Sequence, residues 1–183
     1  MNTFILAIIS FLCHFNSQYF LYTYKKENIN RVPLNDILHE IIPEKKTKLH
    51  DYFCVIQTGF LITYLILKNK KTLFFKFVNI ISILFILRSI SMIVTILPTP
   101  KNCNKPPFIL GGCGDLIFSG HFTLNTTVLY ILLNKIGIHY FIKIYFIFAY
   151  FLSIISTIAS RDHYTIDIFI AILLSFLITD RNL

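Results

Sequence analysis

The chain has 183 residues, of which 55% are hydrophobic, 16% are aromatic and only 14% are charged. A soluble domain of this size usually carries about 25% charged residues, so too few polar side chains are present to cover a water-facing surface. This composition excludes an ordinary soluble globular protein, a disordered tail and a typical nucleic-acid-binding domain. The net charge of +8 instead fits basic residues that flank membrane segments.

Long apolar runs, separated by polar or basic stretches, predict six membrane-spanning helices, because one crossing needs roughly 20 mostly apolar residues. The runs are 3–24, 52–67, 72–97, 115–133, 140–159 and 163–179. The first run has neither a basic start nor an Ala-x-Ala cleavage site, which favours a retained helix over a signal peptide, although polar residues interrupt it at His14, Asn16, Ser17 and Gln18. Short connections after the third run predict antiparallel neighbours. We therefore expect an all-α protein, a single transmembrane domain over residues 1–183 that forms a six-helix bundle.

Six crossings place both termini on one side of the membrane, and the third and fifth loops together on the other side. Loops rich in Lys and Arg tend to stay in the cytoplasm. Around the last four runs, the even loops and the C-terminus are richer in basic residues than the odd loops, which favours cytoplasmic termini. The first loop opposes this assignment, because it also carries basic residues: Lys25, Lys26, Arg31, Lys45, Lys46 and Lys48.

Two polar motifs enter membrane helices from the third and fifth loops, so we expect them to meet on one side. The second motif contains His163 and Asp167, four residues apart, which would share one face of a helix. A carboxylate beside an imidazole fixes its tautomer and stabilises its protonated form, so His163 could act as a nucleophile or a general base. An ion pair with a purely structural role at the start of a helix is the alternative.

The first motif is Ser119-Gly120-His121, preceded by Asp115. Gly120 lets a ligand approach the backbone closely, and the amides at a helix start attract phosphate. Ser119 can donate a hydrogen bond to a phosphate oxygen, Asp115 would share its helical face, and His121 would be the second acid or base. The alternative is an ordinary helix start, with glycine for close helix packing.

Arg88 lies well inside the third apolar run, where a charge is costly and is usually functional. Ser91 and Thr95 follow at helical spacing, which predicts a polar face directed toward the side of both motifs. Arg88 could hold a phosphate or pair with Asp115, and a purely structural buried pair stays open.

Cysteine and histidine spacing predicts no metal site, because neither Cys-x-x-Cys nor His-Glu-x-x-His occurs. Cys103 and Cys113 share the third loop and could form a disulfide if that loop is lumenal. Cys13 and Cys54 fall in or near apolar runs, where we expect them to pack.

Four ordered motifs resemble those of sphingomyelin synthases and related sphingolipid synthases, which belong to the lipid phosphate phosphatase superfamily. The resemblance covers roughly residues 31–179. The motifs are Pro33-Leu34-Asn35-Asp36, the third-run residues Arg88, Met92, Thr95 and Pro98, then Cys113-Gly114-Asp115-x3-Ser119-Gly120-His121, and His163-Tyr164-Thr165-x-Asp167.

This resemblance implies a six-helix membrane enzyme with its site on the exoplasmic or lumenal face, in the Golgi, the plasma membrane or the endoplasmic reticulum. It implies transfer of phosphocholine or phosphoethanolamine from a glycerophospholipid to ceramide, with release of diacylglycerol and without a metal or organic cofactor. The partners would be these membrane lipids and no nucleic acid, and a homodimer stays open. By resemblance His121, His163 and Asp167 are catalytic, and the candidate substrate- or phosphate-binding residues are Arg88, Asp115, Ser119, Gly120, Asp162 and Tyr164.

The sequence also departs from the family pattern. Phe122 stands where the family has Thr, Asn35 replaces a Pro, and the sixth run lacks the family's distal Tyr, Phe and Tyr-His positions. Asp162 is similar to the choline-transferring members, but the headgroup and the acceptor stay open. Two alternatives also stay open: a lipid phosphate phosphatase, whose usual Ser-Arg-x5-His spacing is longer than that between Arg161 and His163, and a non-catalytic membrane lipid-binding relative.

Overall fold

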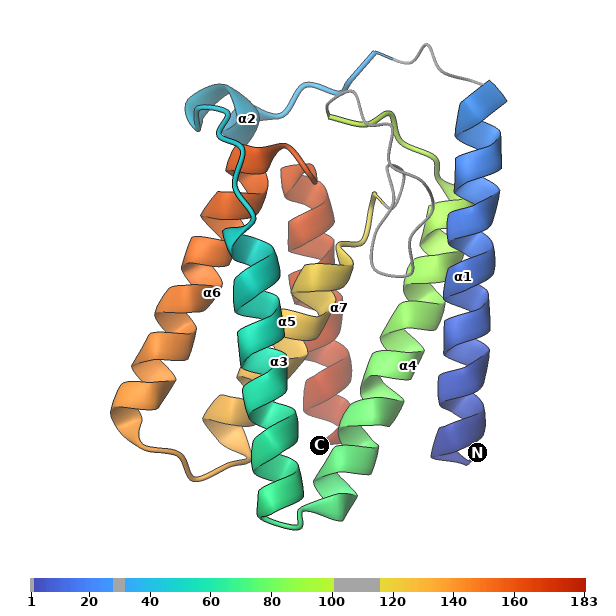
Figure 1. Cartoon of the computed structure of the whole chain (residues 1–183). Coiled ribbons are helices and arrows are strands. Elements are labelled where there is room, and N and C mark those ends of the chain that lie inside the picture. The colour runs from blue at the N-terminus through green and yellow to red at the C-terminus, as the bar shows by residue number, and fades with distance from the viewer. Residues whose placement is uncertain (1, 28–31, 101–115) are drawn as a thin grey trace.

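The computed structural model describes residues 2–27, 32–100 and 116–183, and within these ranges it contains helices and no strand. The helices are α1 (Thr3–Glu27), α2 (Ile37–Ile41), α3 (Leu49–Leu67), α4 (Lys71–Val94), α5 (Gly120–Asn134), α6 (Tyr140–Ser160) and α7 (Thr165–Asn182). The long helices run side by side, and the short α2 lies across one end of the bundle (Figure 1). The all-α prediction is confirmed for the described ranges.

Four of the described helices are long and apolar enough to cross a membrane: Thr3–Tyr24, Leu49–Leu67, Lys71–Val94 and Tyr140–Ser160. The protein is therefore an integral membrane protein. The predicted count of six crossings is not confirmed. α5 has 15 residues, which span about 22 Å against a hydrocarbon core of about 30 Å. α7 is longer but carries three charged residues, Asp167, Asp180 and Arg181.

α5 is the inner helix of the bundle, because it packs against α3, α4, α6 and α7. Its polar side chains are buried, including Thr123, Asn125, Thr126 and Thr127. Two of these hydroxyls are satisfied along the helix, with Thr123 Oγ1 donating to Ser119 O at 2.8 Å and Thr127 Oγ1 to Thr123 O at 2.9 Å. A helix that its neighbours shield from lipid does not need an apolar surface. This explains why α5 can carry several polar residues inside the bundle.

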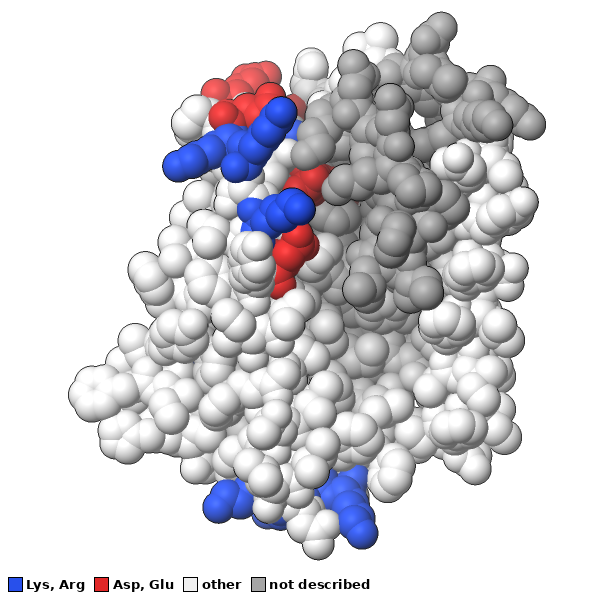
Figure 2. All heavy atoms as spheres, viewed as in Figure 1, with Lys and Arg blue, Asp and Glu red and all other residues white. Residues whose placement is uncertain are grey.

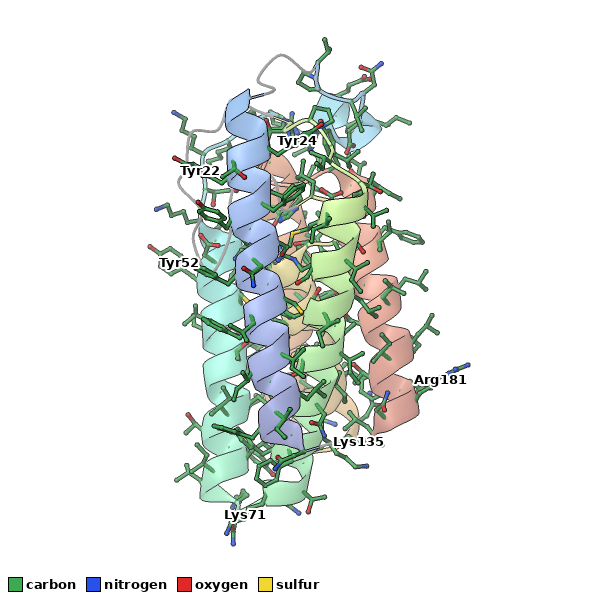
Figure 3. The ribbon with its side chains drawn as sticks, turned by 90° about the vertical axis from the view of Figure 1, so that its right-hand side faces the viewer. Tyr22, Tyr24, Tyr52, Lys71, Lys135 and Arg181 are labelled. Carbon is green, nitrogen blue, oxygen red and sulfur yellow. The ribbon has the colours of Figure 1, made fainter. Side chains whose placement is uncertain are left out.

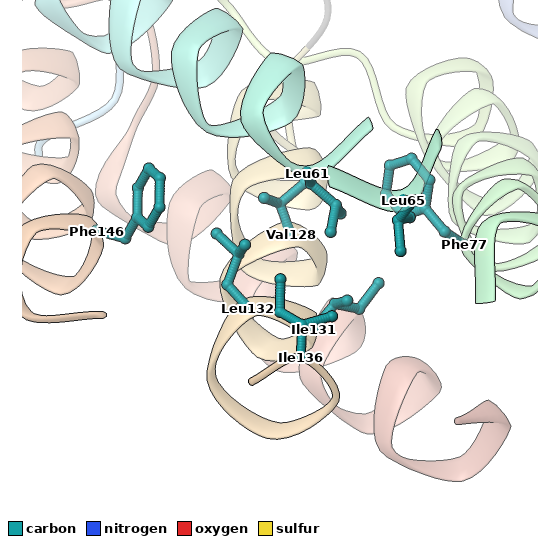
Figure 4. Packing of buried hydrophobic residues seen from close by; sticks show 8 residues of the cluster. All are labelled: Leu61, Leu65, Phe77, Val128, Ile131, Leu132, Ile136 and Phe146. Carbon is teal, nitrogen blue, oxygen red and sulfur yellow. The ribbon is translucent and has the colours of Figure 1, made fainter. Parts of the chain in front are cut away.

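Two apolar clusters hold the helices together. Figure 4 shows the first, which joins α3, α4, α5 and α6 around Leu61, Leu65, Phe77, Val128, Ile131, Leu132, Ile136 and Phe146. The second includes Phe118 and Phe122, which are fully buried on either side of Ser119-Gly120-His121. Phe122 meets Tyr150 edge to face at 5.9 Å between ring centroids. Close packing of these rings restricts the motif between them to one position.

The two ends of the bundle carry different chain segments and side chains. Both termini lie at one end with the α3–α4 and α5–α6 turns, while α2 and the α6–α7 turn lie at the other, as predicted (Figure 1). On the face shown in Figure 2, charged side chains lie in the upper part and at the lower end, and a broad uncharged band separates them. Figure 3 places Lys71, Lys135 and Arg181 at the end of the termini, and Tyr22, Tyr24 and Tyr52 nearer the opposite end.

Several predicted boundaries need correction. α1 is continuous to Glu27, because His14, Ser17 and Gln18 are buried inside the bundle and α1 packs on α4. The polar stretch after α1 contains α2 and the first turn of α3, which begins at residue 49 and not 52. α4 ends at residue 94 and not 97, α5 begins at 120 and not 115, and α7 covers 165–182 in place of 163–179.

Candidate active site

Asp167 ties the two predicted motifs together from a fully buried position. It is the third residue of α7, and its Oδ2 accepts a hydrogen bond from Tyr164 N at 3.0 Å, which satisfies an otherwise open amide at the helix start. Its Oδ1 accepts from Ile117 N at 2.7 Å, and its backbone oxygen accepts from Ser119 N at 3.3 Å. The segment that leads into α5 is therefore attached to the first turn of α7.

His163 is 5% exposed, and its Nδ1 lies 3.4 Å from Asp167 Oδ2. The predicted proximity of the pair is confirmed, but the reason given for it was wrong. α7 begins at Thr165, so His163 precedes the helix and does not share a helical face with Asp167. The turn at Tyr164, which caps α7, brings the imidazole back over the carboxylate. With Nδ1 facing Asp167, Nε2 is the ring nitrogen left for chemistry.

The first loop is docked onto this turn. Asp36 accepts hydrogen bonds from Thr165 N at 2.6 Å and Thr165 Oγ1 at 2.8 Å, and it also caps the first turn of α2. Leu34 N donates to the Tyr164 hydroxyl at 2.9 Å. The His39 ring stacks on Tyr164 at 5.8 Å between centroids, and His39 Nε2 lies 3.1 Å from the backbone oxygen of His163. Because a carbonyl only accepts, His39 Nε2 carries the proton.

These contacts affect the pKa values of Asp36 and Tyr164. Burial tends to raise the pKa of Asp36, but the hydrogen bonds from Thr165 and the charge of His39 outweigh it, so the pKa lies below 3.8. Burial raises the pKa of Tyr164, and the nearby charges of Asp167 and Asp36 add to this rise against the lowering effect of the Leu34 amide. Tyr164 is thus a neutral, buried support of the turn, and its hydroxyl already serves the first loop.

His121, the second residue of α5, has a carboxylate partner that the motifs did not predict. Its Nε2 lies 2.9 Å from Asp51 Oδ1, and the two side chains are 29% and 45% exposed. Asp51 lies in the first turn of α3, beside His50. The sequence signal that could have identified Asp51 is the His50-Asp51 pair, which lies at the start of an apolar run on the same side of the membrane as both motifs.

His50 connects the two motifs. It is buried, its Nε2 lies 3.5 Å from Asp51 Oδ1 and 3.4 Å from Asp162 Oδ2, and its Nδ1 lies 3.2 Å from Ser156 Oγ. Its ring meets the His121 ring edge to face at 5.5 Å between centroids. Both His121 and His163 lie near enough to interact with His50 electrostatically. The structure therefore gathers the predicted histidines around a third one.

Asp162 and Arg161 occupy the turn that ends α6. Asp162 Oδ2 accepts from Ser160 Oγ and faces His50. Arg161 has a positive φ of 58°, and its guanidinium donates to the backbone oxygens of Ile158 at 3.1 Å, Ile42 at 2.8 Å and His39. Arg161 thus fastens α2 to the end of α6 through backbone carbonyls.

Arg88 is 2% exposed and lies against the start of α5. Its Nε donates to Phe118 O at 2.7 Å, and its Nη1 lies 3.1 Å from His14 Nδ1 of α1. A Cβ at Gly120 would lie 3.2 Å from Arg88 Nε, so a larger residue here would require the guanidinium to shift. Ser119 is also fully buried, and within the described part of the chain its Oγ has no hydrogen-bond partner.

The predicted polar face around Arg88 is wrong. Ser91 Oγ donates to Leu87 O of its own helix at 2.9 Å, and Thr95 is exposed at the C-cap of α4. Asp115 and the Cys103–Cys113 pair lie outside the described residues. Cys13 and Cys54 are free thiols. Across the ranges that the structure describes, no three His, Cys, Asp or Glu side chains are grouped as metal ligands.

Comparisons with known proteins agree with the motifs. Residues 112–181 match the family model described as PAP2 superfamily C-terminal. The chain is 27% identical over 184 residues to phosphatidylcholine:ceramide cholinephosphotransferase 1 of Homo sapiens, an alignment that covers 74% of this chain and 44% of the relative. It is 42% identical over 84 residues to phosphatidylinositol:ceramide inositolphosphotransferase 3 of Arabidopsis thaliana, covering 41% of this chain and 28% of the relative.

A third relative is the phosphatidylethanolamine:ceramide ethanolaminephosphotransferase of Trypanosoma brucei brucei, 31% identical over 135 residues, with 60% of this chain and 40% of the relative covered. The chain thus spans less than half the length of these curated relatives. The predicted resemblance to sphingolipid synthases is confirmed.

Proposed function

We propose that the chain, similar to three ceramide phosphotransferases, is itself a sphingolipid synthase. It transfers phosphocholine or phosphoethanolamine from a glycerophospholipid to the primary hydroxyl of ceramide and releases diacylglycerol. The observation that carries this proposal is the ion-pair contact of His163 with the fully buried Asp167, whose hydrogen bonds hold the segment leading into His121. Two imidazoles with a carboxylate partner supply the nucleophile and the acid that headgroup transfer needs.

In the first step, Nε2 of His163 attacks the phosphorus of the donor lipid. A nitrogen–phosphorus bond forms, and the bond between phosphorus and the diacylglycerol oxygen breaks. That oxygen takes the electron pair and receives a proton from His121. Asp167 orients the His163 ring through Nδ1 and stabilises the positive charge that develops on it.

In the second step, the ceramide hydroxyl gives its proton to His121. Its oxygen attacks the phosphorus held on His163, the nitrogen–phosphorus bond breaks, and the electron pair returns to Nε2. The proton that His121 gives to diacylglycerol in the first step is replaced by the proton from ceramide in the second, so His121 returns to its starting state. This order predicts ping-pong kinetics and a phosphohistidine that can be trapped when ceramide is withheld. A strictly ternary kinetic pattern would instead favour direct transfer, with His163 as the base.

The start of α5 is proposed to hold the phosphate. Its first amides attract an anion, and Ser119 Oγ, buried and without a hydrogen-bond partner among the described residues, gains a partner when a phosphate oxygen arrives. Arg88 lies directly against Gly120, so its positive charge adds to the field at this helix start. Its hydrogen bond to Phe118 O also keeps the segment before Ser119 in place.

We further propose that α5 and α7 complete a six-helix transmembrane bundle, with the site on the exoplasmic or lumenal face of the Golgi or plasma membrane. The inner position of α5 supports this arrangement, because its neighbours shield its polar side chains from lipid. The common end of both termini and of the α3–α4 and α5–α6 turns supports an even number of crossings. Lys71, Lys135 and Arg181 at that end fit a cytoplasmic side (Figure 3).

A cell-free assay tests the activity. Purified protein is mixed with fluorescent ceramide and liposomes that contain one donor at a time: phosphatidylcholine, phosphatidylethanolamine or phosphatidylinositol. We expect a labelled phosphosphingolipid with the choline or ethanolamine donor, and a large fall in its rate of formation in His163→Ala and His121→Ala. His139→Ala, which precedes α6 at the opposite end, is the matched control and should retain activity.

The same assay separates the alternatives. Release of phosphate from a lipid phosphomonoester without a labelled ceramide product would identify a phosphatase and overturn the proposal. The Arg161 guanidinium, which binds backbone carbonyls, argues against that outcome. Folded protein that gives no product with any donor would support a non-catalytic lipid-binding relative.

A further inference from the structure

We infer that Asp51 is a positioning residue for His121, so that the site contains two carboxylate–imidazole pairs supplied by different helices. The inference deepens the proposed function and rests on it for its catalytic meaning. The distance from Asp51 Oδ1 to His121 Nε2 is 2.9 Å, shorter than the 3.4 Å between Asp167 Oδ2 and His163 Nδ1. Asp51 comes from α3, which belongs to neither motif.

The atoms in contact assign the proton on His121. A carboxylate can only accept a hydrogen bond, so Nε2 of His121 carries a proton in both the neutral and the charged ring. The proton that His121 delivers to the diacylglycerol oxygen, and later takes from ceramide, is therefore the one on Nδ1. His163 has the opposite arrangement, because Asp167 faces its Nδ1 and leaves Nε2 to react. The two rings present different nitrogens to the substrate.

A buried group holds Asp51 in place. His50 Nε2 lies 3.5 Å from the same Asp51 oxygen that meets His121. His50 is 4% exposed, and both its backbone N and its Nδ1 contact Ser156 Oγ, at 3.3 Å and 3.2 Å. Asp162 Oδ2 lies 3.4 Å from the same Nε2 atom of His50. Asp51 itself is half-exposed, but its neighbour His50 is held by Ser156 of α6.

The charges around His121 set the sign of the expected effect. Asp51 and His50 face it from α3, Asp162 and His163 lie across His50 at the α6–α7 turn, and Arg88 lies beside Gly120. Asp51 is the carboxylate in direct contact, so it favours the charged imidazole. The first step needs a proton on His121, so loss of the Asp51 charge should slow proton delivery to the leaving oxygen.

The experiment compares Asp51→Asn with Asp51→Glu and Asp180→Asn. Asp51→Asn keeps the size of the side chain and removes its charge, and we expect a 10- to 100-fold loss of transfer. Asp51→Glu keeps a carboxylate and should recover most of the rate. Asp180→Asn, at the far end of α7 beside the Tyr130 hydroxyl, should match the wild type.

A double-mutant cycle shows whether Asp51 acts through His121. In the His121→Ala background, Asp51→Asn should reduce the residual transfer no further, because the two residues act as a unit. An equal fold-loss in both backgrounds would overturn the inference and leave the proposed function intact.

A readout that needs no activity separates the two claims. Nitrogen NMR of histidine-labelled protein in micelles reports the tautomer of each ring, and the His121 signal is identified by its loss in His121→Ala. We expect a proton on Nε2 in the wild type and a changed tautomer balance in Asp51→Asn. Identical signals would overturn the pairing whatever the activity. A changed balance in protein that makes no lipid product would support the pairing and refute the synthase.

Discussion

Substitution Asp36→Ala should release the first loop from the catalytic turn without unfolding the bundle. Asp36 accepts hydrogen bonds from Thr165 N at 2.6 Å and Thr165 Oγ1 at 2.8 Å, and from Leu38 N and His39 N at 3.0 Å and 3.4 Å. Loss of the α2 cap costs about 1 kcal/mol. At a half-exposed carboxylate we take about 1 kcal/mol for each bond from Thr165. The sum, about 3 kcal/mol, corresponds to an approximately 100-fold change in the docking equilibrium.

Hydrogen exchange followed by mass spectrometry in micelles measures this change. Residues 32–42 and 163–167 should lose about 100-fold in protection in Asp36→Ala, while α3 and α6 remain protected. Glu44→Ala is the matched control, because Glu44 is exposed just beyond α2. Headgroup transfer should fall together with the protection, since the turn carries His163.

The pH dependence follows from the lowered pKa of Asp36. Burial raises this pKa, but the hydrogen bonds from Thr165 and the charge of His39 lower it by more, so that the pKa lies below 3.8. The stabilisation is therefore fully present above pH 3.8 and is lost only as pH falls through the folded-state pKa. Wild-type protection, corrected for intrinsic exchange, should hold down to about pH 4. Equal protection in Asp36→Ala and wild type, or loss of wild-type protection already near neutral pH, would refute the reasoning.

Three other predictions concern stability and can be measured by thermal unfolding in micelles. Gly120→Ala places a Cβ 3.2 Å from Arg88 Nε and should cost about 1–3 kcal/mol and reduce transfer, whereas Gly59→Ala has nothing within 4 Å and should be neutral or stabilising. An unaffected Gly120→Ala would show that Arg88 moves freely. His14→Ala removes the α1 partner of Arg88 and should cost about 1–3 kcal/mol, and an unchanged midpoint would contradict a role in α1 docking. Tyr164→Phe removes the acceptor of one backbone amide and should cost about 1 kcal/mol; no change would mean that water replaces it.

Much of the helical architecture could be predicted from hydropathy alone. Predicted runs such as 140–159 match the described helices within a few residues, because a lipid-facing helix must be apolar along its length. The proximity of His163 and Asp167 could be predicted from their spacing, although it arises from the turn before α7 and not from a shared helical face. Hydropathy could not show that α5 is an inner helix, since buried Thr123 and Asn125 look like interruptions until neighbouring helices cover them.

The partners of the site residues depend on which helix faces meet. Asp51 reaches His121 because α3 packs on α5, and Arg88 reaches His14 because α1 packs on α4. His163 stands before α7, because Asp167 uses its carboxylate to cap that helix. The local sequence determines an element and the polar groups it carries. A hydrogen bond between distant elements forms only where packing brings donor and acceptor within about 3 Å, and that choice belongs to the tertiary structure.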